Sequence, residues 1–360
     1  MNRAFNFNAG PAALPEWALQ EAQKELLNFR NTGMSVMELS HRSKDYEAVH
    51  NEAKSLLTSL LSIPEDYEIL FLQGGASLQF SMIPMNLVQE GQTAYYALTG
   101  SWSEKALKEA QKLCKTEVAV SSKENSYKNI PALDGASIPS DAAYLHITSN
   151  NTIYGTQWQQ FPTGLNVPLI ADMSSDILCK PLNIEQFDLI YAGAQKNLGP
   201  SGVTVVIIKK DLLSRASDSL PTMLNYNTHA KNNSLYNTPP TFGIYLLSLV
   251  LKWVTNEGGL EALAKRNNEK AALLYNEIDN SEGFYNGHAE LDSRSNMNVT
   301  FTLNSEDATK AFLAQAKEAG FVGLNGHRSV GGCRASIYNA VPFENVERLA
   351  QFMNEFRKSY

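Results

Sequence analysis

The sequence predicts an α/β fold, a mostly parallel sheet covered by helices on both faces, followed by a smaller C-terminal α+β domain. Seven short apolar runs alternate with helical segments through the first two thirds of the chain, which is typical of a parallel sheet. This alternation stops after residues 203–208. A chain of 360 residues also exceeds the size at which one hydrophobic core keeps growing, so we expect two domains.

The elements of the sheet follow from apolar runs and turn residues. The predicted strands cover residues 67–72, 93–98, 116–120, 143–148, 167–171, 189–192 and 203–208. A helix begins at Pro15-Glu16 and reaches about Phe29, with proline in the first turn. A second helix places apolar residues on one face from Tyr46 to Leu61. Further helices are expected after residues 73–77 and 100–103.

The last third of the chain has a different pattern. Residues 225–241 are rich in Asn, Thr and Pro and are predicted to form an extended excursion. A helix over 241–256 ends at Gly258-Gly259, which we interpret as a domain hinge. The predicted division is an N-terminal arm (1–15), a large domain (16–257) and a small domain (258–360). The small domain should contain a helix over 260–278, a strand over 298–303, a helix over 306–319 capped by Ser305, a strand over 334–338 and a helix from residue 344.

Composition excludes several classes of protein. The net charge of −7 argues against nucleic-acid binding. Cys114, Cys179 and Cys333 are odd in number and lack metal-ligand spacing, so we expect no disulfide framework, no metal site and a reducing cytoplasm. No apolar run is long enough to span a membrane. Neither GxGxxG nor GxxxxGK[ST] occurs, which removes the usual nucleotide-binding fingerprints.

A lysine and an aspartate are predicted to meet at one edge of the sheet. Lys196 lies in a loop between the strands 189–192 and 203–208, and Asp172 follows the strand 167–171. Ligands of open α/β sheets bind at the carboxyl ends of the strands. The pair fits pyridoxal phosphate, with Lys196 as the Schiff-base amine and Asp172 as the partner of the pyridinium nitrogen. Alternatively, Lys196 is a solvated surface charge and Asp172 a turn residue.

Three further segments could hold such a cofactor. Residues 74–77 (Gly-Gly-Ala-Ser) precede a helix, whose N-terminus attracts phosphate. Trp102 could stack on a pyridine ring, and Thr152 could hydrogen-bond a ring oxygen or phosphate. The alternatives are an ordinary turn, a core tryptophan and an Asn-Thr-Gly turn.

Basic residues suggest an anionic substrate. His41-Arg42, His327-Arg328 and Arg334 occur in an acidic protein, and arginine binds carboxylate and phosphate bidentately. A substrate with both groups would need several such residues. Any one of these arginines could instead be exposed on a loop without a ligand.

Eight motifs, in order along the chain, resemble the phosphoserine aminotransferase family. They are residues 6–11 (Asn-Phe-Asn-Ala-Gly-Pro), 74–77 (Gly-Gly-Ala-Ser), 101–102 (Ser-Trp), 149–152 (Ser-Asn-Asn-Thr), 171–175 (Ala-Asp-Met-Ser-Ser), 192–202 (Ala-Gly-Ala-Gln-Lys-Asn-Leu-Gly-Pro-Ser-Gly), 237–241 (Asn-Thr-Pro-Pro-Thr) and 326–336 (Gly-His-Arg-Ser-Val-Gly-Gly-Cys-Arg-Ala-Ser). The run around Lys196 is highly specific. The resemblance spans nearly the whole chain.

The resemblance implies the fold type I architecture of class-V aminotransferases, a homodimer, and pyridoxal phosphate on Lys196. It assigns cofactor contacts to Ala76, Ser77, Trp102, Thr152, Asp172 and Gln195, with Asn237 and Thr238 reaching the cofactor phosphate of the other subunit. Arg334 would bind the substrate α-carboxylate. His41, Arg42, His327 and Arg328 would surround the distal phosphate or the glutamate side chain, with Arg42 as the glutamate contact.

The implied reaction is a transamination between L-glutamate and 3-phosphohydroxypyruvate in serine biosynthesis. A phosphorylated oxo acid of pyridoxine biosynthesis, the precursor of 4-phosphohydroxy-L-threonine, is a plausible second substrate. Some family members carry arginine at the position of Ser77. The hydroxyl here leaves open which of His41, Arg42, His327 and Arg328 hold the substrate phosphate.

Three alternatives to this reaction remain on sequence alone. A cysteine desulfurase of the same fold would need a mobile catalytic cysteine, whereas Cys333 beside Arg334 suggests packing. A protein with the fold of these enzymes but without catalytic activity would not need Lys196, Asp172 and the arginines together, so their presence argues against this alternative. An α/β binding module without cofactor would be colourless.

Overall fold

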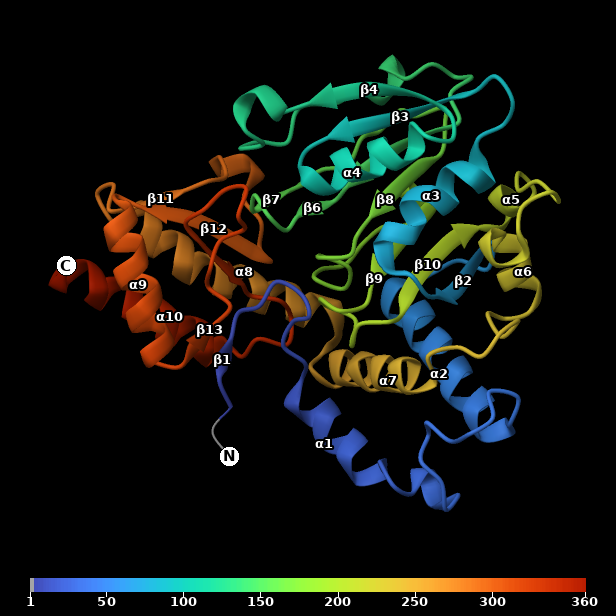
Figure 1. The fold of residues 1–360 in the computed structure, drawn as a ribbon, viewed down its shortest axis with the longest axis horizontal. Coiled ribbons are helices and arrows are strands. Elements are labelled where there is room, and N and C mark those ends of the chain that lie inside the picture. Colours follow the sequence, from blue (N-terminus) through green and yellow to red (C-terminus); the bar gives the residue numbers. More distant parts are fainter. Residues whose placement is uncertain (1–2) are drawn as a thin grey trace.

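The central feature of the computed structural model, which describes residues 3–360, is a seven-stranded sheet (Figure 1). Its strands lie in the order β2-β10-β9-β8-β5-β3-β4. They are β2 (Tyr67–Leu72), β3 (Thr93–Leu98), β4 (Lys115–Ser121), β5 (Tyr144–Thr148), β8 (Leu169–Asp172), β9 (Leu189–Gly193) and β10 (Thr204–Lys209). Only β10 runs antiparallel to its neighbours in this sheet. The predicted α/β class and mostly parallel sheet are therefore confirmed.

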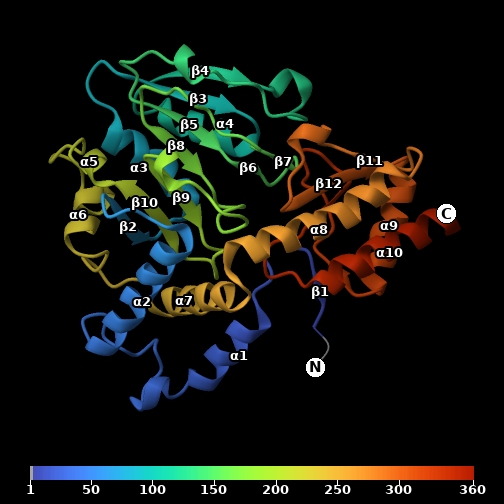
Figure 2. The ribbon, with the colours of Figure 1, turned by 180° about the vertical axis from the view of Figure 1, so that it is seen from behind.

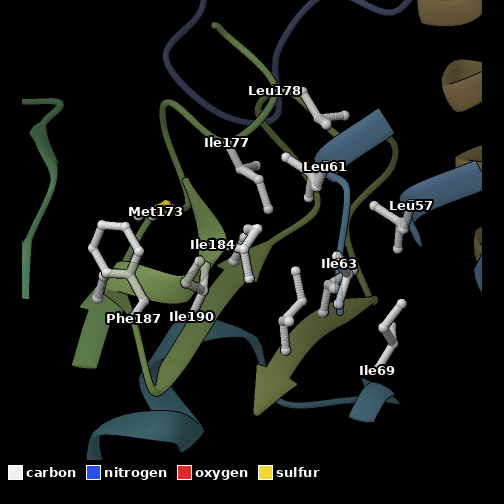
Figure 3. Packing of buried hydrophobic residues seen from close by; sticks show 14 of the residues in the cluster. Leu57, Leu61, Ile63, Ile69, Met173, Ile177, Leu178, Ile184, Phe187 and Ile190 are labelled. Carbon is white, nitrogen blue, oxygen red and sulfur yellow. The ribbon is translucent and has the colours of Figure 1, made fainter. Parts of the chain in front are cut away.

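Helices cover both faces of this sheet. One face packs against α3 (Gly75–Leu87), α4 (Ser101–Ala110), α5 (Lys210–Leu213) and α6 (Tyr226–Lys231). The other face packs against α2 (Lys44–Leu61) and α7 (Thr241–Asn256), and α1 (Glu16–Glu25) lies against α7. Leu57 and Leu61 of α2 belong to the same buried cluster as Ile69 and Ile190 of the sheet (Figure 3). Side chains of each strand alternate between the two faces, so both faces are apolar.

The C-terminal part of the chain has a separate apolar cluster. A three-stranded sheet in the order β11-β12-β14 packs against three helices. These elements are α8 (Gly259–Asp279), β11 (Tyr285–Gly287), β12 (Asn298–Leu303), α9 (Glu306–Glu318), β14 (Cys333–Ser336) and α10 (Phe343–Ser359). Figure 2 shows α8 leading from α7 into this part. Strand β1 (Phe5–Asn6) pairs with β13 (Phe321–Val322), so the N-terminal arm also lies here.

Most predicted elements occur within a few residues of their expected bounds. The Ser305 side chain caps α9 by accepting a hydrogen bond from the Ala308 backbone N–H, as predicted. Gly258 and Gly259 have φ values of 95° and 77° at the junction of α7 and α8, a left-handed conformation that glycine adopts readily.

Two predictions of local structure were wrong. The first helix ends at Glu25, before Phe29, which lies in a 3₁₀ turn. The excursion over 225–241 is not wholly extended, because Asn225 caps the short helix α6. The strand predicted over 334–338, by contrast, is confirmed as β14, Cys333–Ser336. The 3₁₀ turn Phe29–Asn31 and the helix α6 (Tyr226–Lys231) are too short to show the apolar periodicity by which helices are predicted from a sequence.

Several elements are too short to give a pattern. They are the strands β1, β6 (Asn150–Asn151), β7 (Thr156–Gln157), β11 and β13, and the 3₁₀ helices Phe29–Asn31, Lys123–Asn125, Gly135–Ser137, Ile184–Gln186, Thr222–Leu224 and Leu291–Ser293. Within residues 3–360, no helix has the length and apolar character needed to cross a membrane.

Candidate active site

Lys196 lies in the loop that joins β9 to β10, above the end of the sheet. Its Nζ donates a hydrogen bond to the Thr152 hydroxyl at 2.7 Å. Burial lowers the pKa of Lys196 to about 8, the charge of Asp172 opposes this shift, and Arg334 adds to it. A larger fraction of the amine is therefore neutral, and thus nucleophilic, at neutral pH than for an ordinary lysine.

Asp172 is the last residue of β8 and lies next to this loop. Its side chain is 4% exposed. Oδ1 accepts hydrogen bonds from the Ser174 backbone N–H at 2.9 Å and from the Ser174 hydroxyl at 2.6 Å. Burial raises the pKa of Asp172, while Ser174 and Lys196 act in the opposite direction. The Ser174 bonds orient the carboxyl group at the carboxyl end of the sheet, where ligands bind in such folds.

A cavity lies between these two residues and the start of α3. Its lining comprises Gly75, Ala76, Ser77, Trp102, Thr148, Asn150, Thr152, Asp172, Ser174, Ser175, Gln195 and Lys196. Gly74, just before α3, has φ 84°, and a Cβ there would lie 2.7 Å from Leu78. This turn therefore requires glycine, and it directs the free N–H groups of the first helical turn to the cavity.

Cationic side chains gather near the cavity. The Arg334 guanidinium donates from Nη1 to the Thr152 carbonyl at 3.4 Å. Burial lowers the pKa of His327, and the nearby charges of Arg334, Arg328 and Lys105 lower it further. The Lys105 Nζ lies 4.2 Å from the Trp102 ring centroid. Arg334, Arg328 and Lys105 take part in none of the ion pairs found among residues 3–360.

Comparison with known proteins identifies the family. The model of the family Aminotransferase class-V matches residues 4–349. The chain belongs to the class-V aminotransferases. Its relatives place it among the phosphoserine aminotransferases: the enzyme of that name from Geobacillus kaustophilus is 68% identical over the full length of both chains.

Solved structures agree with this class-V assignment. A phosphoserine aminotransferase studied for radiation damage of its Schiff base superimposes with a TM-score of 0.97 at 63% identity, covering 100% of both chains. The pyridoxal-phosphate-bound phosphoserine aminotransferase of Trichomonas vaginalis gives a TM-score of 0.91 at 42% identity, covering 98% of this chain and 100% of that one. This class-V enzyme is thus a fold type I transaminase, and its cofactor is pyridoxal phosphate.

The residues of the aminotransferase cavity fit that cofactor. Lys196 offers an amine 5.6 Å from the Trp102 ring centroid, and Asp172 offers a buried carboxyl group at the same wall. The Thr148 hydroxyl, which lines the cavity, is buried and has no partner within residues 3–360. The start of α3 suits a phosphate. Amine, acid, aromatic face and anion site are the groups that pyridoxal phosphate requires.

Seven predicted cofactor residues line this one cavity. They are Ala76, Ser77, Trp102, Thr152, Asp172, Gln195 and Lys196. Asn237 and Thr238 do not line it. Asn237 borders a separate pocket beside β2, and the exposed Thr238 has its hydroxyl 3.3 Å from His41 Nδ1.

The predicted substrate residues fall into two groups. His327, Arg328 and Arg334 lie together, as the shared effect on the pKa of His327 indicates. His41 lies beside Thr238 instead, and its neighbour Arg42 is exposed. The single chain therefore does not gather all five basic residues into one contact group.

Sequence reasoning missed several residues of the aminotransferase site. Lys105 follows Trp102 by one helical turn, so helical spacing could have indicated it. Ser174 follows Asp172 by two residues. Asn150, whose Nδ2 donates to the Ser175 hydroxyl at 2.8 Å, lies in the motif 149–152, but no role was assigned to it.

The N-terminal arm also borders the site. The Ala12 backbone N–H donates to the Gln195 carbonyl at 2.9 Å. Gly10 lies against the Lys196 side chain, since a Cβ at Gly10 would be 3.4 Å from Lys196 Cγ. The part of the chain described here holds no cluster of His, Cys, Asp and Glu that could bind a metal ion.

Proposed function

We propose that this aminotransferase moves the amino group of L-glutamate to 3-phosphohydroxypyruvate, giving O-phospho-L-serine and 2-oxoglutarate, in a reversible reaction. The observation that carries this proposal is the group of cations around His327 beside the lysine cavity, namely Arg328, Arg334 and Lys105. A buried guanidinium without a carboxylate partner is costly unless an anionic ligand pairs with it. The names of the most similar relatives support the same substrate.

Each anionic group of the substrate has a proposed partner. Arg334 takes the α-carboxylate, because its guanidinium and the Lys196 amine both donate hydrogen bonds to Thr152. Arg334 is half-buried, and its buried Nε has no partner within the described chain, which leaves this donor for a ligand. His41, Arg42, His327 and Arg328 surround the distal phosphate or the glutamate side chain, with Arg42 as the glutamate contact. Guanidinium groups favour these planar and tetrahedral anions.

Pyridoxal phosphate, when bound, supplies an aldehyde that condenses with amines and a ring that accepts electrons from the substrate carbon. Lys196 would hold the cofactor through Nζ, and the free Nζ would take the α-proton of the substrate and deliver it to the cofactor carbon. Its lowered pKa suits both roles. Asp172 holds the proton of the ring nitrogen, and Trp102 packs on the ring. Ala76, Ser77, Thr152 and Gln195 complete the cofactor contacts.

The active site is proposed to be shared within a homodimer. Asn237 and Thr238 lie outside the cavity of their own chain, and Thr238 is exposed. Large apolar side chains of the same region face solvent, with Leu27 85%, Met37 55% and Tyr236 48% exposed. In the proposed dimer these surfaces are covered, and Asn237 and Thr238 reach the cofactor phosphate of the other subunit.

Mixed dimers test the shared site. K196A loses the lysine, and an N237A/T238A double variant loses the proposed contacts to the neighbouring cofactor. Co-expressed chains with different affinity tags would give hybrids in which one site has Lys196 from one subunit and Asn237 and Thr238 from the other. We expect activity in the hybrid well above that of either parent homodimer. A hybrid with no gain would contradict the shared site.

The domain division is also a proposal. Separate apolar clusters support a large domain over 16–257 and a small domain over 258–360, and Gly258-Gly259 offers a hinge. Substrate-induced closure would then bring Arg334 toward the cofactor. G258A/G259A should slow turnover more than it weakens cofactor binding, because left-handed φ strains alanine. Stopped-flow and equilibrium titration would separate these effects.

We further propose a place in cytoplasmic serine biosynthesis, supported by three free cysteines, Cys114, Cys179 and Cys333, since free thiols suit a reducing compartment. A second role, forming 4-phosphohydroxy-L-threonine for pyridoxine biosynthesis, rests on the same phosphate site. Comparing kcat/KM for the two phosphorylated oxo acids would rank the two roles.

Absorbance spectroscopy gives the decisive test of the proposed reaction. The purified protein should carry a visible absorbance band that L-glutamate bleaches. The phosphorylated oxo acid should restore the band, and hydroxypyruvate without phosphate should restore it far more slowly. K196A should show no bleaching on this timescale. Equal rates with both oxo acids would refute phosphate recognition, and a band unaffected by glutamate would refute the amino donor.

A further inference from the structure

A buried polar pair lies next to Asp172 in the sheet, outside the lining of the cavity. His146 of β5 and Tyr191 of β9 are 1% and 0% exposed, and His146 Nε2 lies 2.9 Å from the Tyr191 hydroxyl. Tyr191 is in turn the neighbour of Asp172 across the β8–β9 pair, and its hydroxyl lowers the pKa of the Asp172 carboxyl group. Neither residue lines the cavity, so no contact with substrate explains this arrangement.

Strand register places the three side chains on one face of the sheet. His146 is opposite Ile170 in the β5–β8 pair, and Asp172 is opposite Tyr191 in the β8–β9 pair. Residues two apart in a strand point to the same side, so Ile170 and Asp172 lie on one face of the sheet. Their pairing partners His146 and Tyr191 lie on the same face. Asp172, Tyr191 and His146 therefore form a row on one face of the sheet. Asp172, at one end of the row, lines the cofactor cavity.

The protons in this row can be assigned from burial. Burial lowers the pKa of His146 to about 3, so the imidazole is neutral and has one N–H. Nδ1 is buried and has no partner within residues 3–360. A buried N–H without an acceptor costs more than a buried lone pair without a donor. The proton therefore belongs on Nε2, which donates to the Tyr191 oxygen and leaves the Tyr191 O–H to donate toward Asp172.

We propose that His146 and Tyr191 act as positioning residues that keep Asp172 ionised toward the ring nitrogen of the cofactor. This inference rests on the proposed role of Asp172. A hydroxyl donated to a carboxylate stabilises its charged form, and a second donor behind the hydroxyl strengthens that bond. We call this series of contacts, from His146 through Tyr191 to Asp172, the relay. Without the relay, the proton shared with the ring nitrogen shifts toward Asp172, and the ring becomes a weaker electron acceptor.

Other charged and titratable groups act on the same residues. Lys196 and Asp176 are the charged groups near Asp172. The charge of Lys196 lowers the pKa of Asp172, whereas Asp172 and Asp176 repel each other and the charge of Asp172 raises the pKa of Asp176. Tyr96 of β3 and Tyr226 of α6 lie near Tyr191. None of these replaces the His146 contact, because the Tyr96 hydroxyl is bonded to Tyr144 at 2.7 Å and Tyr226 donates to Gln79 at 2.6 Å.

The test is nitrogen-15 NMR of the holoenzyme loaded with cofactor labelled at the ring nitrogen. H146L removes the donor, whereas H146Q keeps an N–H that can donate to Tyr191. Y144F is the matched control, because it removes a neighbouring buried hydroxyl that does not touch the relay. We expect H146L to move the ring-nitrogen signal toward the unprotonated pyridine value, H146Q to return it, and Y144F to leave it unchanged. Turnover of H146L should fall by up to about tenfold, the size of one neutral hydrogen bond.

The outcomes separate this inference from the role on which it rests. D172N should shift the ring-nitrogen signal most. An unchanged signal in D172N would refute the assigned role of Asp172. A shift in D172N together with a wild-type signal in H146L would overturn the relay alone. If H146L does not fold, Y191F keeps the ring and removes the hydroxyl, and a wild-type signal there would equally overturn the relay.

Discussion

Burial lowers the pKa of two lysines in this molecule, and one of them, Lys196, lines the cofactor cavity. Lys196 lies at the cofactor cavity of the large region, whereas Lys270 lies in α8 with 0% exposure. Burial lowers the pKa of Lys196 to about 8 and that of Lys270 to about 7. By pKa alone, Lys270 would be the better nucleophile.

Their hydrogen-bond partners make the difference. Lys270 Nζ donates to the carbonyl groups of Ile337, Tyr338 and Val341 at 2.9, 2.8 and 3.2 Å. These three carbonyl groups can accept all three N–H bonds of the ammonium, and the residue is not exposed to solvent. Lys196 Nζ has a single hydroxyl partner beside a cavity. A lowered pKa marks a reactive lysine only where a carbonyl compound can approach.

Activity should show the largest contrast between the two lysines. K196A should lose at least about a thousandfold in kcat, because it removes the group that holds the cofactor and moves the proton. K270M, which removes only the amine, should keep turnover within about tenfold of the wild type. Steady-state rates with L-glutamate and the phosphorylated oxo acid measure both. A K270M variant that folds and loads cofactor but is as inactive as K196A would contradict the assignment of Lys270 as a structural lysine.

Stability should show the reverse contrast. K270M leaves buried carbonyl groups without their donor, so we expect a loss of about 2–4 kcal/mol in the free energy of unfolding. K196M should change stability little or increase it, since active-site groups are rarely placed for stability. Urea unfolding of the cofactor-free proteins gives both values. Equal destabilisation by the two substitutions would show that Lys196 is also a structural lysine.

The pH dependence of cofactor loading would sharpen the picture of Lys196. Only the neutral amine attacks an aldehyde, so the loading rate of the cofactor-free protein should rise with pH and level off above about 8, the pKa of Lys196. Because the Asp172 charge raises that pKa, D172N should move the midpoint to lower pH. Stopped-flow absorbance across this range measures it. A midpoint near that of free lysine would contradict the burial effect.

The smallest effect concerns the exposed Lys105. Its Nζ lies over Trp102 and near His327. K105A should lower kcat/KM for the phosphorylated oxo acid by about three- to fivefold, as expected for one exposed charge, and leave the glutamate half-reaction unchanged. K108A, one turn further along α4, is the matched control. Equal effects of K105A and K108A would assign the loss to general surface charge.

Local features of the site could be predicted from the sequence. The apolar run before Lys196, the acid at the end of β8 and the glycine pair before α3 are patterns of a few residues, governed by backbone preferences and hydrophobic periodicity. The roles of Ala76, Gln195, Asn237 and the basic residues came from the resemblance instead, because those residue types have no local signature.

The sequence by itself determined the α/β class, the seven strands, the loop that carries Lys196 and the position of Asp172, because these depend on neighbours in the chain. Tertiary structure alone decided that Thr152 meets Lys196, that Arg334 reaches Thr152, and that β10 enters the sheet antiparallel. It also decided which buried lysine has a cavity. Such contacts depend on strand register and on packing between segments far apart in the chain, and no local preference specifies them.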